Sequence, residues 1–184
     1  MPRNVEIKAR LAAPETTRRL VADAADGPPE PLEQTDTFFR AGTGRLKLRE
    51  LGDGRAELIF YARPDTPDPA ESRFERAAVA DAPALRALLG SALGVAGTVR
   101  KRRLLYHIGR TRVHLDDVRG LGWFLELEVQ LAEGEPAAAG VREAEGLLRR
   151  LAVPREALVA EAYVDLLRGG DGGETGDGGV GEEA

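Results

Sequence analysis

Apolar and polar residues alternate strictly near the start of the chain, from Asn4 to Leu11. Successive side chains of a β-strand point to opposite faces, so this segment is predicted to be a strand with one apolar and one polar face. The polar face carries Asn4, Glu6, Lys8 and Arg10. The same two-residue period recurs along the chain and predicts a protein rich in strands.

Further strands are predicted wherever alternation runs between turns rich in glycine or proline. They cover Gln34 to Arg40, Arg45 to Leu51, Ala56 to Arg63, Ser72 to Val79, Thr98 to Ile108, and a hairpin within Val113 to Leu131. The hairpin turns at Gly120-Leu121-Gly122, and the other short glycine turns make consecutive strands antiparallel neighbours. The first strand and these seven give eight strands in all.

Four segments instead have apolar residues at helical spacing. They begin at Pro14, at the capping residue Asp81, near Val141 and near Leu158. Amphipathic helices need an apolar surface to cover, and the apolar strand faces supply one. If helices cover the outside, the charged faces point inward. The predicted fold is therefore α+β: an eight-stranded antiparallel β-barrel, or tunnel, with a charged interior and amphipathic helices outside.

The charges on these strand faces are segregated by sign. The basic faces hold Arg45, Lys47 and Arg49 on one strand and Lys101 and Arg103 on another. The acidic faces hold Asp116, Glu126 and Glu128. A half-buried sheet with a solvated polar face is the ordinary alternative for any one strand. Solvated faces usually mix the two signs, however, because like charges side by side repel.

Lysine usage points the same way. Of the 26 basic residues only three are lysines, and all three lie on these strand faces: Lys8, Lys47 and Lys101. A basic wall and an acidic wall together suit a polyanion that carries a divalent metal. Arginine and lysine bind phosphate oxygens, while carboxylates hold Mg²⁺ or Mn²⁺.

Composition limits the other possibilities. The chain of 184 residues lacks cysteine, so disulfides, thiolate chemistry and zinc ribbons are excluded. Residues 169–184 hold eight glycines and five acids, and we expect a disordered acidic tail after a single domain at 1–168. Without that tail, 26 acids balance 26 bases, which makes nucleic acid an unlikely partner. We find no signal peptide or membrane-spanning run and expect a soluble, cytoplasmic protein.

Several motifs, in order, resemble the CYTH superfamily of triphosphate tunnel enzymes, most closely its class IV adenylate cyclase-like branch. The resemblance covers residues 4–168 and rests on NVEIKARL, RLKLRE, SRFE, VRKRRLLY, HLDDV with GLG and FLELE, and AYVDLL. It implies a tunnel that binds a triphosphate with Mg²⁺ or Mn²⁺, and it leaves room for a homodimer.

Site residues follow from the same resemblance. The implied metal ligands are Glu6, Asp116, Glu126 and Glu128. The implied phosphate-binding residues are Lys8, Arg45, Lys47, Arg49, Arg73, Lys101 and Arg103. The implied catalytic residues are Lys8, Glu126 and Glu128.

Two positions depart from the family pattern. Asn4 stands in place of the first acid of the opening E-x-E-x-K motif, and a neutral amide removes one anionic ligand. The strand LIFYARP lacks the lysine that many members carry, and Arg63 is the candidate substitute.

Three functions remain open. An adenylate cyclase, which converts ATP to cyclic AMP and pyrophosphate, is the first. A triphosphatase acting on tripolyphosphate, thiamine triphosphate or a nucleotide is the second, and a non-catalytic triphosphate-binding module is the third. The cyclase and the triphosphatase use the same charged residues and differ in how the protein holds the non-phosphate end of the substrate.

Overall fold

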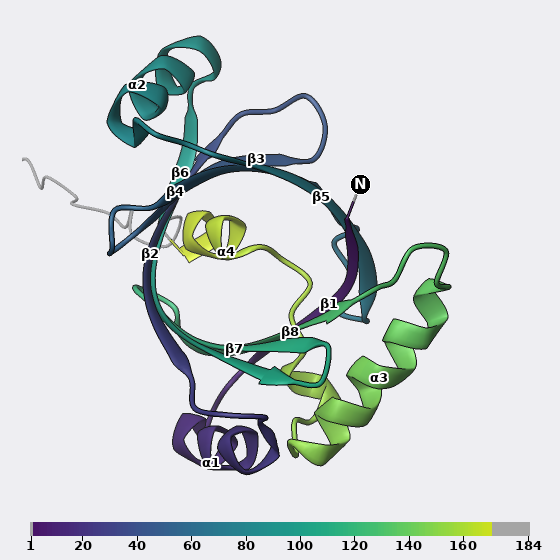
Figure 1. The fold of residues 1–184 in the computed structure, drawn as a ribbon. Coiled ribbons are helices and arrows are strands. Elements are labelled where there is room, and N and C mark those ends of the chain that lie inside the picture. Colours follow the sequence, from purple (N-terminus) through teal and green to yellow (C-terminus); the bar gives the residue numbers. More distant parts are fainter. Residues whose placement is uncertain (1, 171–184) are drawn as a thin grey trace, which may run out of the picture.

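The computed structural model describes residues 2–170; of the predicted tail, residues 171–184 lie outside the described residues. The strands are β1 (Arg3–Arg10), β2 (Glu30–Phe39), β3 (Arg45–Leu51), β4 (Ala56–Ala62), β5 (Ala70–Ala78), β6 (Val95–Ile108), β7 (Thr111–Val118) and β8 (Gly122–Gln130). They close into one barrel in the order β1-β5-β4-β3-β2-β6-β7-β8 (Figure 1). All neighbours pair antiparallel, so the predicted eight-stranded antiparallel barrel is confirmed.

The barrel closes because β1 pairs with strands on both of its sides. It pairs with β8 along most of its length and with β5 at its start. In this register Glu6 lies opposite Glu128, and Lys8 lies opposite Glu126. Closure thus brings the first strand of the sequence beside the last one on the barrel wall.

Charged strand faces point inward, as predicted. Lys8, Lys47 and Lys101 all line the interior cavity. The alternate residues of β1, such as Val5 and Ile7, face outward into the main apolar core. This arrangement places the hydrophobic core of the protein between the barrel wall and its helices, where apolar surface is removed from water.

Three helices lie outside the barrel: α1 (Pro14–Ala24), α2 (Ala82–Leu93) and α3 (Ala137–Arg150) (Figure 1). Helix α3 packs Ala144, Leu147 and Leu148 against the core. It approaches β1 closely because Gly140 has no side chain: an added Cβ would lie 2.8 Å from Val5 Cγ2. Helix α2 projects from the barrel, with Leu88 65% exposed.

The fourth predicted helix begins later than its apolar pattern indicates. Leu158 pairs with Ala9 of β1 as an isolated bridge, and the Val159 N–H donates a 2.9 Å hydrogen bond to the Lys8 carbonyl. These bonds hold the segment extended after a short 3₁₀ helix, η1 (Arg155–Ala157). The helix proper, α4, therefore runs over Tyr163–Gly170.

Helix α4 lies across one end of the barrel, within the ring of strands in Figure 1, whereas the other three helices lie outside it. Tyr163 and Val164 pack against Phe124 and Val99 from the barrel wall. The prediction that helices cover the outside thus holds for three of the four described helices, and α4 closes one end instead.

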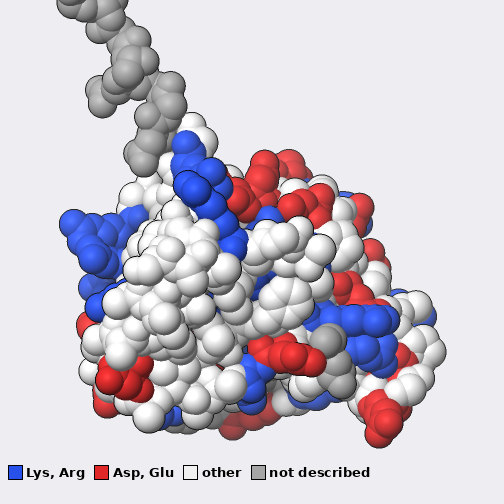
Figure 2. Space-filling view, turned by 90° about the horizontal axis from the view of Figure 1, so that it is seen from above, with Lys and Arg blue, Asp and Glu red and all other residues white. Residues whose placement is uncertain are grey.

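No helix in residues 2–170 combines the length and apolar character needed to span a membrane. On the face shown in Figure 2, basic and acidic side chains lie close to one another between uncharged residues.

Candidate active site

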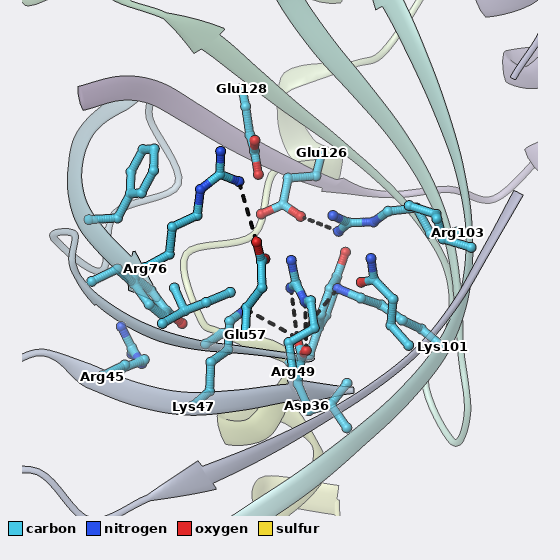
Figure 3. A pocket seen from close by; sticks show the side chains of 18 of the residues that line it. Asp36, Arg45, Lys47, Arg49, Glu57, Arg76, Lys101, Arg103, Glu126 and Glu128 are labelled. Atoms are coloured by element: carbon cyan, nitrogen blue, oxygen red, sulfur yellow. Dashed lines mark hydrogen bonds and ion pairs between the residues drawn. The ribbon is translucent and has the colours of Figure 1, made fainter. Parts of the chain in front are cut away.

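The barrel encloses a cavity of about 460 Å³. It is lined by inward residues of β1 to β8 and, at the end covered by α4, by Ala162 and Tyr163. Five of the predicted phosphate-binding residues on two strands line it together: Arg45, Lys47, Arg49, Lys101 and Arg103. Figure 3 shows Arg45, Lys47 and Arg49 across the cavity from the carboxylates of Glu126 and Glu128 on β8. Arg103 instead lies beside Glu126, and its Nη2 donates a 2.9 Å hydrogen bond to Glu126 Oε2.

Asp36 of β2 organises the basic side and is only 2% exposed. Its carboxylate accepts hydrogen bonds from Arg49 Nε at 2.8 Å and from Lys47 Nζ at 3.1 Å. Burial alone would raise the pKa of Asp36, but Arg49 and Lys47 hold this pKa well below its usual range. The sequence interpretation missed Asp36, although alternation places it on the same face as Gln34.

Asp116 plays a similar part on β7. Its two oxygens each accept a 2.6 Å hydrogen bond from Arg103, and Lys101 Nζ lies 3.4 Å away. Burial raises its pKa, but Arg103 and Lys101 outweigh that effect and lower the pKa. The predicted metal role of Asp116 is not supported, because its carboxylate is fully buried and already neutralised by these cations.

The remaining acids gather on β1 and β8. Glu6, Glu126 and Glu128 line the cavity, and their mutual repulsion is visible in the pKa of Glu6. Burial and then the charges of Glu128 and Glu126 raise that pKa to about 7. Carboxylate oxygens grouped in this way are the donors that hard divalent cations prefer.

His114 of β7 completes the acidic group. Its Nδ1 lies 3.6 Å from Glu126 Oε2 and 3.6 Å from Glu128 Oε1. One donor atom from each of the three residues lies within 4.8 Å of the others. The pKa of His114 is lowered by burial and by Arg103, so the neutral ring is favoured. The sequence analysis did not identify His114 as a candidate site residue.

Lys8 faces the cavity beside this group. Its Nζ donates a 3.2 Å hydrogen bond to the Glu161 carbonyl and lies 4.2 Å from the centre of the Tyr163 ring. Burial lowers the pKa of Lys8, although Glu126 opposes the shift. Tyr163 therefore contacts a predicted site residue from α4, and no strand pattern could have indicated that contact.

The two departures from the family motifs also lie in the cavity wall. Asn4 is buried at the first-acid position, and within residues 2–170 its Oδ1 has no hydrogen-bond partner. Arg63 points inward, with its Nε 3.8 Å from Glu6 Oε2. Arg63 thus supplies a cation on β4's side of the cavity, beside the acidic group.

The prediction that Arg73 lines the tunnel is wrong. Its side chain is 63% exposed and donates a 2.9 Å hydrogen bond to Glu71 on the outer surface. The inward residues of β5 are its alternates, among them Phe74 and Arg76. Both faces of this strand carry charged residues, so its pattern alone did not fix which face is inside.

Comparison with known proteins agrees with this geometry. Among curated proteins, no sequence matches the chain. The PH1012 protein from Pyrococcus horikoshii OT3 has a similar structure, with a TM-score of 0.80 and 23% identity over 89% of this chain and 99% of that one. An adenylate cyclase candidate from Vibrio parahaemolyticus gives a TM-score of 0.73 with 20% identity over 90% and 97% of the two chains.

A third structure is an adenylyl cyclase candidate from Hippeastrum that has a dominant triphosphatase activity. Its TM-score is 0.62, with 16% identity over 92% of this chain and 96% of that one. At these identities the structural likeness shows the fold alone. The CYTH domain model, however, matches residues 2–163 of the sequence itself. With the closed barrel and its two charged walls, this match shows that the chain belongs to the CYTH domain family.

Proposed function

We propose that the protein is a divalent-metal-dependent enzyme that binds a triphosphate inside the barrel. One observation carries the proposal: basic residues of β3 and β6 and carboxylates of β1 and β8 line a single cavity. Membership of the CYTH family supports an enzyme that acts on triphosphates.

The basic wall would bind the phosphate oxygens. Arg45 contacts α4 through a 2.9 Å hydrogen bond to Asp165, and Lys47 and Arg49 follow it along β3. Asp36 holds Arg49 and Lys47 in place, Asp116 holds Arg103, and Asp65 with Asp165 holds Arg45. Little side-chain entropy therefore has to be lost when a triphosphate binds. Preorganised cations of this kind stabilise charge that develops on a transferring phosphoryl group.

Glu6, Glu126 and Glu128 would hold the metal, Mg²⁺ or Mn²⁺. When bound, such a metal neutralises phosphate charge and polarises the phosphorus centre. The protein's own groups position the substrate: Lys8 lies next to Glu126 and can bind a phosphate oxygen there. Its depressed pKa also makes Lys8 a candidate proton acceptor, but phosphate binding is the role that its place in the cavity favours.

Adenylate cyclase activity is the first candidate reaction, on the motif resemblance to the class IV branch. In that reaction the ribose 3′-hydroxyl attacks the α-phosphate, and pyrophosphate leaves along the basic wall. Triphosphatase activity is the second, and the Hippeastrum neighbour with its dominant triphosphatase activity favours it. A module that binds a triphosphate without turnover is the third, and Asn4 at the first-acid position favours that one.

Product identification separates these reactions. The purified protein is incubated with ATP, tripolyphosphate or thiamine triphosphate, each with Mg²⁺ or Mn²⁺. Cyclic AMP with pyrophosphate identifies a cyclase, and orthophosphate release identifies a triphosphatase. Tight binding without products identifies a binding module. If the protein neither binds nor turns over any of these compounds, the proposal is contradicted.

Two variants test the site itself. Glu126→Gln and Glu128→Gln should each lower turnover by at least about a hundredfold if the carboxylates hold the metal. Glu128→Gln should not lower the melting temperature much, because it removes one of several mutually repelling charges. Glu126→Gln should lower it more, because Arg103 and Lys8 lose a buried counter-charge. Glu75→Gln, on the exposed face of β5, is the matched control and should leave turnover unchanged. Full activity after exhaustive EDTA treatment would exclude the metal-dependent model.

A further inference from the structure

His114 is a buried polar side chain without a hydrogen-bond partner. It is 1% exposed, and within residues 2–170 neither ring nitrogen makes a hydrogen bond. A buried polar group left unpaired is costly, so such groups are rare and need an explanation, such as a catalytic role or a bound ion. Glu126 Oε2 and Glu128 Oε1 each lie 3.6 Å from Nδ1, and Glu126 Oε2 also accepts a 2.9 Å hydrogen bond from Arg103.

The distances from Nδ1 to the two carboxylates are too long for hydrogen bonds but suit three ligands of one cation. The two Nδ1–oxygen separations are 3.6 Å, and the oxygens lie within 4.8 Å of each other. Three atoms so spaced can all lie about 2.1–2.4 Å from one point, which is the range of metal–nitrogen and metal–oxygen bonds in proteins. The strand register produces the arrangement, because His114 on β7 lies directly opposite Glu126 on β8.

We propose that His114 is a metal ligand, and that with Glu126 and Glu128 it forms a mixed nitrogen–oxygen site that favours Mn²⁺ over Mg²⁺. This inference rests on the metal-dependent function proposed above and specifies which ion that function uses. Magnesium binds almost exclusively to oxygen, whereas first-row transition ions accept imidazole nitrogen. A ligand set made of carboxylates alone would lack this preference. Asn4, which supplies no charge at the first-acid position, makes the nitrogen donor more important for holding the ion.

Electron spin-echo spectroscopy of Mn²⁺ bound to the wild-type protein tests the proposal directly. A histidine nitrogen bound to Mn²⁺ modulates the echo, and incorporation of ¹⁵N-histidine changes the modulation. The chain has only two histidines, and His107 is exposed, so the signal is easily assigned. The measurement uses Mn²⁺ alone, without a nucleotide whose nitrogens would interfere. Absence of histidine modulation on the bound ion would overturn the proposal.

The second arm measures ion affinity. The concentration of free Mn²⁺ is measured from its electron paramagnetic resonance signal at room temperature. The affinity for Mg²⁺ is obtained from its competition with Mn²⁺. His114→Leu should weaken Mn²⁺ binding at least about tenfold and Mg²⁺ binding less, so that the preference for Mn²⁺ falls. His107→Leu is the matched control and should change neither. A purely structural role for His114 would alter the melting temperature and leave the ratio of the two affinities unchanged, which would count against the proposal.

The outcomes also separate this inference from the proposed function. If His114→Leu keeps the wild-type ion preference while Glu126→Gln loses Mn²⁺ and turnover, then the function stands and the histidine ligand is excluded. If the wild-type protein binds no Mn²⁺, the histidine ligand is excluded as well, and the product assay with Mg²⁺ decides the function independently. Should His114→Leu fail to fold, the wild-type echo measurement alone decides.

Discussion

The hydroxyl of Tyr163 donates a 3.1 Å hydrogen bond to Oδ2 of Asp116, 47 positions earlier in the chain. The same ring lies 4.2 Å from Lys8 Nζ and 5.0 Å from Lys101 Nζ. Helix α4 is thereby joined to the basic wall through one buried side chain. The aromatic face stabilises two cations, and the hydroxyl supplies a hydrogen bond to the buried carboxylate.

Substitution of Tyr163 should therefore separate these two contributions. Tyr163→Phe removes the hydrogen bond and should cost about 1–2 kcal/mol of unfolding free energy. Tyr163→Ala also removes the ring that packs on Phe124 and should cost about 3–5 kcal/mol. Urea denaturation measures both. Equal losses in the two variants would show that the ring contributes little and that α4 is not anchored through it.

Residues beyond α4 should be dispensable. The glycine-rich and acidic composition of the tail offers little apolar surface to bury, so ordering it would cost entropy without compensation. Ending the chain after Gly170, where α4 ends, should leave melting and turnover unchanged. Lower turnover in the shortened protein would show instead that the tail takes part in the site.

Asp36→Asn should destabilise the substrate-free protein. It leaves Lys47 and Arg49 without their buried counter-charge, and breaking a buried ion pair costs about 3–5 kcal/mol. Added tripolyphosphate supplies the missing negative charge and should stabilise the variant more than the wild type. The difference in unfolding free energy with and without tripolyphosphate measures this effect.

Asp68→Asn is the matched control for that experiment. Its pair with Arg155 is exposed, with 61% and 71% of the two side chains accessible, so its loss should change stability by less than about 1 kcal/mol. If Asp36→Asn were as mild as this control, Asp36 would not be the group that holds the basic wall.

Lys101 should make stability depend on alkaline pH. Burial and the charge of Arg103 lower its pKa from 10.5 to about 8 in the folded protein. Between these two values the unfolded chain keeps a proton that the folded protein has released, so unfolding free energy rises with pH across this window. The full effect is on the order of 3 kcal/mol at most.

The variant Lys101→Met isolates the contribution of Lys101 to the pH dependence of the unfolding free energy. Other groups titrate in both proteins, so the difference between their urea denaturation curves at pH 7.5, 9 and 10.5 reports Lys101 alone. The wild type should gain stability relative to the variant as pH rises. A constant difference across this range would show that the pKa of Lys101 is not depressed.

The three lysines should be protected together by ligand. Lys8, Lys47 and Lys101 line one cavity, so tripolyphosphate should shield all of them from a small amine-reactive reagent. Mass spectrometry of the labelled peptides gives the extent of modification at each site, with the N-terminal amine as the unprotected reference. Modification that does not respond to ligand at any of the three would contradict a shared binding cavity.

Lysine-to-arginine substitution tests the same cavity by shape. Arg keeps the charge, but its planar guanidinium does not fit the space of a compact ammonium. Lys8→Arg and Lys47→Arg should therefore both weaken tripolyphosphate binding. Wild-type affinity in the two variants would show that these positions do not contact the phosphates closely.

Much of the barrel could be predicted from the sequence because alternation is a local property of a strand. It fixes which residues share a face, as it does for Arg45, Lys47 and Arg49 on β3. Segregated sign, together with helices that need the apolar strand faces to cover, then indicated that the charged faces point into the barrel. The three lysines, Glu126 and Glu128 were found in this way, and the structure places all of them in the cavity wall.

Only the tertiary structure decided which other residues those side chains contact. The resemblance implied Arg73 as a phosphate-binding residue, and alternation could not correct this because it does not say which face of β5 is inside. The structure places Arg76 in the cavity wall instead. The meeting of His114 with Glu126 and Glu128, and of Tyr163 with Asp116, depends on strand register and on where α4 lies. These contacts join residues far apart in sequence, and they form only when barrel closure and apolar packing at its end fix their separation.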